Sequence, residues 1–497
     1  MSFTRHMKGL SKDALVYGTG FALNSLTGLI TAPIATRIFL PEDYGVIMLT
    51  QTVMGFLSVI VALNLSSGVF RQYFEYDDPV VRKRVLSTAF WFLVLNGLLY
   101  SGLVWLCAPR IETLLLMHDS GAHDGDKRYG FTAYFRILAL GVFFSVLDVY
   151  LRSLLRMNRR PWAFTAISTG VAVLNVVLFI VLVYFLRLGI EGALWCGVVA
   201  SIVACAAGLV ANAGSFGLRF SRHDLGQFFA YCLPQFPSGV LGWLIVQSSP
   251  FLLNYYSSLA QQGQFAIGVR VASVILLFTT AFRLAWDPFA LSIMKQDDAR
   301  MIYARTYSLF CAGLGLAGAL LAVYAKPLLI IIAPPPYHPA YALVFVLVAA
   351  YLVQEGNNIL GIGIAISKRT KFISYAQLIA FVAYGCAALA LVPRLGAWGA
   401  VIALLGAMYA QALAYNHFAR RLYPIPFRFA AASGFMAGIF LLAGSGVWMV
   451  RTMGFLEASA VALLYTPLLA GFAYRFGLTQ GERKKVLGWL PWKTASP

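Results

Sequence analysis

The strongest chemical signal in the sequence is a group of charged residues inside one long apolar stretch. Residues 265–294 are mostly apolar, and as a helix they would be long enough to cross a membrane core of about 30 Å. The stretch nevertheless contains Arg270, Arg283 and Asp287. Each charge near the middle of a bilayer costs at least about 2.5–3.5 kcal/mol, so it is expected to face protein, an opposite charge or water. We therefore predict that this helix lines a cavity.

The two arginines of this stretch differ in their sequence neighbours. Arg283 and Asp287 are four positions apart, so on a helix they share a face and can offset each other. No acidic residue lies within four positions of Arg270, which falls on a different helix face. Pro288 removes a backbone donor and favours a kink just after Asp287. For Arg270, a role in the cavity and a structural role at an interface both stay open.

A counterpart occurs earlier in the chain. Asp148, Arg152 and Arg156 recur at intervals of four, along one face of a helix. We favour the interpretation in which the arginines extend to cytoplasmic headgroups while Asp148 neutralises Arg152. Arg136 lies nearer the other end of the same helix. For this residue, contact with lipid headgroups and a role in the cavity both stay open.

A third polar group contains Glu355, Asn357 and Asn358. A glutamate among carboxamides inside a bilayer could carry a proton or bind Na⁺, although a structural hydrogen-bond network is the favoured interpretation. With Asp148, these residues are the candidates for ion coupling. Three further residues, from the first two apolar stretches, complete the candidate cavity set: Asn24, Arg37 and Arg71.

Composition determines the class of protein that positions these residues. Of 497 residues, 60% are hydrophobic and only 11% charged, which is typical of a polytopic membrane protein. Apolar runs separated by charged or Pro/Gly-rich breaks predict an all-α protein with about fourteen transmembrane helices. The predicted spans are 13–38, 44–70, 85–108, 131–155, 162–186, 190–212, 226–256, 262–294, 304–332, 340–366, 372–392, 395–418, 427–450 and 455–476.

The net charge of +19 is distributed as in a membrane protein and not as in a nucleic-acid-binding one. Counted together with the adjoining ends of the predicted spans, the tails and alternate loops contain 27 of the 38 Lys and Arg residues, and the other loops contain 8, with Lys326 among them. This asymmetry follows the positive-inside rule and predicts that both termini are cytoplasmic. Part of the excess charge is expected to meet anionic lipid headgroups. No nucleic-acid partner is expected.

The chain shows an internal repeat. Gly189 and Gly396, each in an RLG motif, are 207 positions apart, and Arg160 and Arg369 are 209 apart. We predict two parallel copies of six spans, a topology in which substrate binds between two halves that rock against each other. The predicted division is an N-terminal lobe at 1–215, a C-terminal lobe at 216–425, and two extra helices with a cytoplasmic tail at 426–497.

No metal, disulfide or other cofactor is expected. The six cysteines lack CxxC spacing and are predicted to be buried free thiols. The loop that contains His118 and His123 lacks the spacing of an EF-hand. The sequence has no G-x-x-x-x-G-K-[ST] motif for a nucleotide.

Three short motifs support a family resemblance: TRIFLPEDYGVIMLTQTVMGF, LPQFPSGVLGWLIV and FRLAWDPFALS. They resemble the polysaccharide-transporter branch of the MOP superfamily, which includes the Wzx-type flippases of lipid-linked oligosaccharides and is related to lipid II flippases and MATE exporters. The resemblance covers about residues 10–425. One departure is Ser249-Pro250-Phe251, where many members have an Asp-Arg pair.

The resemblance implies a MATE-like fold with a central cavity between two six-helix lobes. It also implies a bacterial inner-membrane flippase for undecaprenyl-pyrophosphate-linked oligosaccharides that serves O-antigen, capsule or exopolysaccharide synthesis. The partners would be the lipid-linked oligosaccharide, membrane lipids and the polysaccharide polymerase machinery. The protein would then be a secondary transporter and not an enzyme, driven by H⁺, Na⁺ or the membrane potential.

Two alternatives stay open at this point. A MATE-like antiporter of organic cations would need carboxylates that no cation compensates. A membrane glycosyltransferase or polymerase of the same pathway would need catalytic acids near the outer face, where the candidates are Asp124 and Asp126.

Overall fold

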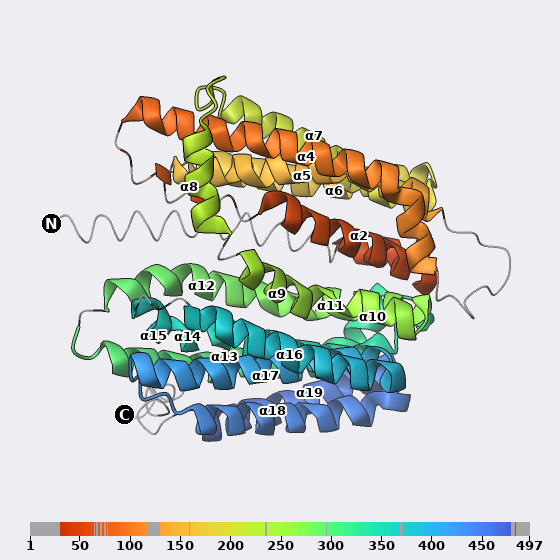
Figure 1. Ribbon diagram of the computed structural model, residues 1–497. Coiled ribbons are helices and arrows are strands. Elements are labelled where there is room, and N and C mark those ends of the chain that lie inside the picture. Colours follow the sequence, from red (N-terminus) through yellow and green to blue (C-terminus); the bar gives the residue numbers. More distant parts are fainter. Residues whose placement is uncertain are drawn as a thin grey trace, which may run out of the picture. The chain divides into compact units, whose positions relative to one another are not determined.

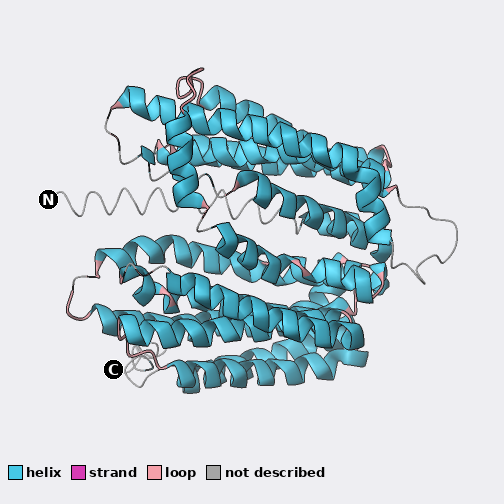
Figure 2. Cartoon of the chain, in the orientation of Figure 1, coloured by secondary structure: helices cyan, strands magenta, loops and turns pink. Residues whose placement is uncertain are grey.

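The computed structural model describes residues 30–63, 65, 68–69, 72–73, 76, 78–116, 130–158, 160–233, 236–294, 296–367, 369, 371–478 and 483. Over these residues the chain forms helices joined by short turns, and no strand occurs among them (Figure 2). The predicted all-α class is confirmed. The described residues contain 12 helices that are long and apolar enough to cross a membrane, or 13 if one bent pair counts as a span. The count of fourteen stays a prediction, because most of the first expected span, 13–38, lies outside the described residues.

The described chain divides into two compact units, Met1–Ala266 with Leu391–Ala400, and Ile267–Ala390 with Val401–Pro497. These units are defined by packing, whereas the predicted repeats are defined by sequence similarity. The boundaries of the repeats at 215 and 425 therefore stay a prediction.

The first unit is built around one helix, α5 (Phe131–Met157), which packs against α2, α4, α6 and α7 (Figure 1). Its side chains Phe135, Tyr150 and Leu154 are completely or almost completely buried. The Tyr150 hydroxyl donates a hydrogen bond of 2.8 Å to the Leu86 carbonyl of α4. The surrounding elements are α2 (Pro41–Ala62), α4 (Pro79–Leu116), α6 (Pro161–Phe179) with the π-helical turn η1 (Ile180–Phe185), and α7 (Gly189–Ala211).

The connection from α7 to the next helix, α8 (Arg222–Cys232), is held against α4. The Gly217 amide donates to the Ser87 hydroxyl over 2.8 Å. Asp224, whose side chain is completely buried, accepts from the Arg84 guanidinium at 2.9 and 3.3 Å. Such a bidentate pair fixes geometry as well as charge, so it sets the position at which α8 begins.

Two long apolar stretches are broken helices. The expected span 226–256 consists of α8, α9 (Phe236–Gln247) and α10 (Ser249–Tyr256), and the last two are bent by 49°. Pro250 stands in the first turn of α10, where it has no amide to continue the preceding helix. The expected span 262–294 consists of α11 (Leu259–Ala272) and α12 (Val274–Ser292).

This second stretch is interrupted at Ser273, and the kink expected near Pro288 stays a prediction. The Ser273 hydroxyl donates a hydrogen bond of 2.7 Å to the Arg270 carbonyl, a type of contact that often bends helices. Helix α12 continues through position 288 to Ser292.

The second unit is built around α13 (Ala299–Ile332), which packs against α12, α14, α18 and α19. Tyr303 of α13 is buried, and its hydroxyl donates a hydrogen bond of 2.6 Å to the Ala290 carbonyl of α12. The other elements of the chain after α13 are η2 (Pro335–Tyr337), α14 (Ala340–Leu360), α15 (Ile362–Ile366), α16 (Lys371–Leu395), α17 (Ala397–Leu422), α18 (Phe429–Met449), η3 (Val450–Thr452), α19 (Phe455–Phe472) and the π-helical turn η4 (Ala473–Gly477).

The two glycines matched in the sequence repeat share one backbone conformation. Gly189 has φ +59° and Gly396 has φ +53°, and each lies at the start of a helix. This left-handed conformation strains residues that have a Cβ atom. Their common geometry supports the repeat from which they were predicted.

Two other glycines allow helices α2 and α11 to touch through their backbones. A Cβ atom on Gly263 would lie 1.8 Å from the Pro41 carbonyl oxygen, and one on Gly45 would lie 2.3 Å from the Leu259 carbonyl oxygen. Both clashes are with backbone, so no side-chain rotation can relieve them. Small residues at helix crossings are a common means of close packing in membranes.

We expect Gly263→Ala to destabilise the folded protein by about 1–3 kcal/mol, because the added methyl group would push helices α2 and α11 apart. The measurement is the thermal unfolding midpoint of purified protein in detergent. Gly226→Ala is the matched control, because Gly226 lies in α8 with open space around it. The control should be neutral or slightly stabilising. Equal midpoints for the two variants would show that the crossing is not tight.

Candidate functional site

Arg270 lies in the last turn of α11, next to the break at Ser273. It is half-buried, inside the apolar candidate span Leu259–Thr280. The end of a helix carries partial negative charge on its last carbonyl groups. The interruption therefore lies within the span, where the Arg270 carbonyl accepts from the Ser273 hydroxyl.

Arg283 of α12 lies near Glu355 of α14. The distance from Arg283 Nη1 to Glu355 Oε1 is 3.8 Å, so this is a loose ion pair. The Arg283 side chain is 43% exposed and the Glu355 side chain is 10% exposed. Asp287, the partner expected from spacing, is on the same helix as Arg283, but its side chain lies outside the described part of the structure.

The polar residues around Glu355 separate into two groups. Asn358 donates a 3.1 Å hydrogen bond to Glu355 Oε2, so it belongs with the Arg283 pair. Asn357 is buried and donates instead to the Met408 carbonyl at 3.2 Å and to Gln411 Oε1 at 3.0 Å. The second group supports the structural interpretation for Asn357. The first places a carboxylate, a guanidinium and a carboxamide together.

Aromatic side chains fix the segment of α12 that contains Arg283. Phe282 stacks on Trp286 with centroids 5.9 Å apart, and Trp286 meets Tyr303 edge-on at 5.8 Å. Trp286 is only 3% exposed. These rings pack α12 onto α13 and hold the base of the Arg283 side chain.

Asp148 and Arg152 form an ion pair on α5, as their spacing predicted. Asp148 is 4% exposed, and its Oδ2 atom accepts from Arg152 Nη2. Among the described residues, no partner is found for Asp148 Oδ1. The guanidinium of Arg156 is exposed and lies 5.7 Å from the centre of the Phe164 ring. This arrangement supports the interpretation in which Asp148 neutralises Arg152.

Two of the remaining predicted cavity residues, Arg136 and Arg37, are among the residues that the structure describes. Arg136 is exposed and its guanidinium lies 5.5 Å from the ring centre of Trp105, which is itself exposed. A Trp–Arg pair of this kind is common at the membrane interface and supports the headgroup role. Arg37 is exposed in a helical stretch at 30–38. Asn24 and Arg71 lie outside the described residues.

The sequence analysis missed one buried cation. Lys326 was counted with a loop, but it lies within α13 and is 7% exposed. Its ammonium donates to the carbonyls of Val450 and Arg451 at 2.5 and 3.1 Å. These carbonyls belong to η3, directly after α18, where the partial negative charge of a helix end favours a cation. The one signal in the sequence is that this lysine lies six residues before the end of the predicted span 304–332.

The sequence predicted neither a disulfide nor a metal site, and the residues involved are the cysteines and the candidate metal ligands. All six cysteines are free, although Cys386 is exposed and was expected to be buried. Within the described ranges, no group of His, Cys, Asp and Glu side chains could hold a metal ion. The loop with His118, His123, Asp124 and Asp126 lies outside them.

The comparison with solved structures identifies the fold. The lipid II flippase MurJ in an inward closed conformation matches with a TM-score of 0.70 at 15% identity, over 93% of this chain and 99% of that one. An inward-facing multidrug resistance MATE transporter of the MOP superfamily matches with a TM-score of 0.63 at 16% identity, over 85% and 99%. A MOP superfamily transporter from Pyrococcus furiosus matches with a TM-score of 0.58 at 15% identity, over 86% and 96%. The predicted MATE-like fold is confirmed.

The comparison with protein-family models identifies the family to which the chain belongs. No curated protein sequence matches the chain. A family model described as "Polysaccharide biosynthesis protein" matches residues 34–340, which is more than half of the chain. The resemblance inferred from the three short motifs is thus confirmed: this multi-pass membrane protein belongs to the polysaccharide biosynthesis protein family and has the fold shared by the lipid II flippase and the MATE transporters.

Proposed function

We propose that the protein is a flippase that moves undecaprenyl-pyrophosphate-linked oligosaccharides across the bacterial inner membrane by alternating access. The product would serve O-antigen, capsule or exopolysaccharide synthesis and would pass to polymerase machinery. The observation that carries the proposal is the half-buried Arg270 at a helix break inside an apolar span. The family and the fold support the same class of substrate and process.

The proposed function requires positive charge inside the membrane spans, and the chain has such charges. A flippase must lower the cost of taking a pyrophosphate through hydrocarbon while the lipid tail stays outside. Guanidinium groups donate paired hydrogen bonds to phosphate oxygens and remain charged at any physiological pH. Arg270 and Arg283 are inside predicted spans and supply such groups.

We propose that the Arg283–Glu355 pair couples transport to an ion. Glu355 holds Arg283 only loosely, at 3.8 Å, and it also accepts from Asn358. A proton or Na⁺ on Glu355 would weaken its attraction for Arg283 and release the guanidinium to an anionic substrate. Asp148 is a weaker candidate for coupling, because it is held by Arg152 on its own helix.

The cation antiporter is the second hypothesis from the sequence. It requires carboxylates without a compensating cation, and both Asp148 and Glu355 lie beside an arginine. This pairing favours an anionic substrate. The glycosyltransferase hypothesis depended on Asp124 and Asp126, which lie outside the described residues. The inner-membrane location with both termini in the cytoplasm is part of the proposal and rests on the charge asymmetry of the loops.

We expect Arg270→Ala to lower export of surface polysaccharide by about 10-fold or more, because a charge-assisted hydrogen bond contributes about 1.5–3 kcal/mol. Arg270→Lys should recover part of the export, because it restores the charge but not the planar fork. The measurement is polymer output of a deletion strain carrying each variant, with the amount of membrane protein determined by immunoblot. Arg451→Ala, at an exposed position, is the control. Wild-type output from Arg270→Ala would remove this residue from the substrate path.

We expect Glu355→Gln to abolish the dependence of transport on an imposed H⁺ or Na⁺ gradient, because the carboxylate that takes the ion is gone. The measurement is translocation of a fluorescent polyprenyl-linked oligosaccharide in proteoliposomes, with and without the gradient. Asn357→Ala is the contrasting variant, since we assign a structural role to the hydrogen bonds of its amide with Met408 and Gln411. It should lower the thermal unfolding midpoint and leave the gradient dependence unchanged. A Glu355→Gln protein that still responds to the gradient as the wild type does would exclude Glu355 as the coupling group.

A further inference from the structure

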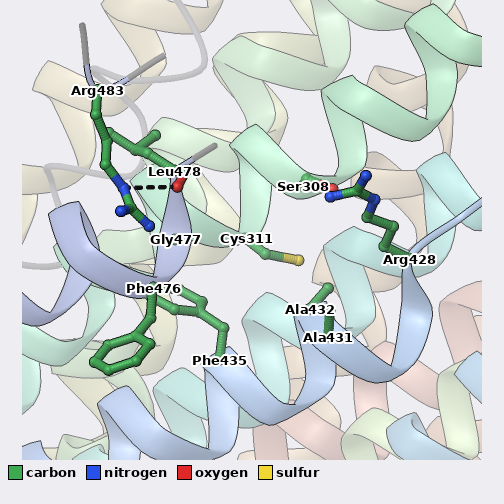
Figure 3. Close-up of a pocket in the computed structure, with 10 residues that line it drawn as sticks. All are labelled: Ser308, Cys311, Arg428, Ala431, Ala432, Phe435, Phe476, Gly477, Leu478 and Arg483. Atoms are coloured by element: carbon green, nitrogen blue, oxygen red, sulfur yellow. Dashed lines mark hydrogen bonds between the residues drawn. The ribbon is translucent and has the colours of Figure 1, made fainter. Parts of the chain in front are cut away.

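A pocket of about 340 Å³ lies in the second unit, at one end of α13, α18 and η4 (Figure 3). Its polar lining consists mainly of Arg428, Arg483 and Ser308. Its apolar lining includes Phe435 and Phe476. None of these residues takes part in the transport proposal, so the pocket is a separate feature of the molecule.

The polar part of the pocket is positively charged. Figure 3 shows Arg428 and Arg483 on opposite sides of the pocket, with Ser308 near Arg428. None of the ten lining residues is acidic. Arg428 is also the N-cap residue of α18, so the partial positive charge of that helix end adds to the guanidinium.

Arg483 is held in place by the end of η4. Its Nε atom donates to the Leu478 carbonyl over 3.0 Å, and its Nη2 atom donates to the Arg475 carbonyl. These bonds satisfy carbonyl groups at a helix end and fix the guanidinium at the border of the pocket. Both cations thus have positions set by helix ends.

The other part of the pocket borders an apolar surface. Phe476 is 64% exposed and packs on Phe472 with centroids 4.8 Å apart. Leu463, Leu464 and Leu468 of α19, the helix that leads into η4, are also mostly exposed. In a membrane-spanning helix, such side chains are expected to face lipid chains. The pocket therefore joins a cationic site to a lipid-facing helix surface.

The position of the pocket along the membrane normal matches a headgroup. Ser308 lies nine residues after the start of α13, which is about 13 Å along a helix. The loops at this end of the helices belong to the basic set that the charge distribution assigns to the cytoplasm. Anionic phospholipids on that side attract basic residues.

We propose that this pocket binds one anionic phospholipid of the cytoplasmic leaflet. The phosphate lies between Arg428 and Arg483, on the side of the pocket that contains Ser308, whose hydroxyl donates to the Ala304 carbonyl over 3.2 Å. An acyl chain extends along Phe476 and the exposed leucines of α19. A soluble anion would leave the aromatic wall uncovered, and a zwitterionic lipid would bring an ammonium to two guanidiniums. The ligand is therefore an amphiphile with net negative charge.

The test is lipid binding to the full-length protein in phosphatidylcholine nanodiscs with and without phosphatidylglycerol. Bound phosphatidylglycerol is counted by native mass spectrometry. The double variant Arg428→Gln/Arg483→Gln should weaken its retention about 10-fold or more. The double variant Arg421→Gln/Arg475→Gln is the matched control. It removes the same charge from exposed positions at the same end of the unit, outside the pocket, and should retain the lipid within about twofold.

Three further measurements keep the test decisive. Unfolding midpoints in pure phosphatidylcholine should agree for the two double variants, and the single variant Arg428→Gln should weaken retention even if the Arg483 variant does not fold. Inorganic phosphate at millimolar concentration should not displace the lipid. Equal retention by the two double variants would overturn the proposal, because binding would then depend only on overall charge. Displacement by phosphate would also overturn it, since the site would then bind a free anion.

Discussion

The cost of a charge in hydrocarbon is the constraint on which this structure depends. An ion taken out of water loses solvation worth several kcal/mol, and only a well-placed partner offsets the loss. The chain meets this constraint in different ways. Asp148 and Arg152 neutralise each other on one helix. Lys326 instead caps the carbonyls at the end of a neighbouring helix. In both arrangements a partner within the protein offsets the charge.

The other two charges are placed differently. Arg283 is 43% exposed and lies 3.8 Å from Glu355. The guanidinium can therefore leave Glu355 and bind another anion at a small cost in free energy. Arg270 stands where α11 ends inside a span. Broken helices at membrane depth are tolerated where they are buried in protein or line a water-filled cavity, and transporters use such helix ends to meet ions and substrates. We assign transport to Arg283 and Arg270, and we assign structural roles to the Asp148–Arg152 pair and Lys326.

The class of fold and the family could be predicted from the sequence, because both depend on local patterns. Apolar run lengths predicted the helices, and an i, i+4 spacing predicted the Asp148–Arg152 pair. The contact of Arg283 with Glu355 could not be predicted, because it joins residues of different helices and depends on how α12 packs against α14. The sequence predicted a kink near Pro288 but not the interruption at Ser273, where a serine hydroxyl bonds to the backbone. Proline is a common cause of a break, but the packing of the surrounding helices decides where it occurs.

The central claim is that the protein moves an anionic lipid-linked sugar. The most direct measurement is the rate at which purified protein in proteoliposomes translocates two fluorescent polyprenyl glycolipids with the same sugar, one with a pyrophosphate link and one with a neutral link. We predict fast translocation of the pyrophosphate-linked lipid and little movement of the neutral one. Equal rates for the two lipids, or transport of an organic cation such as ethidium with no movement of either, would contradict the account.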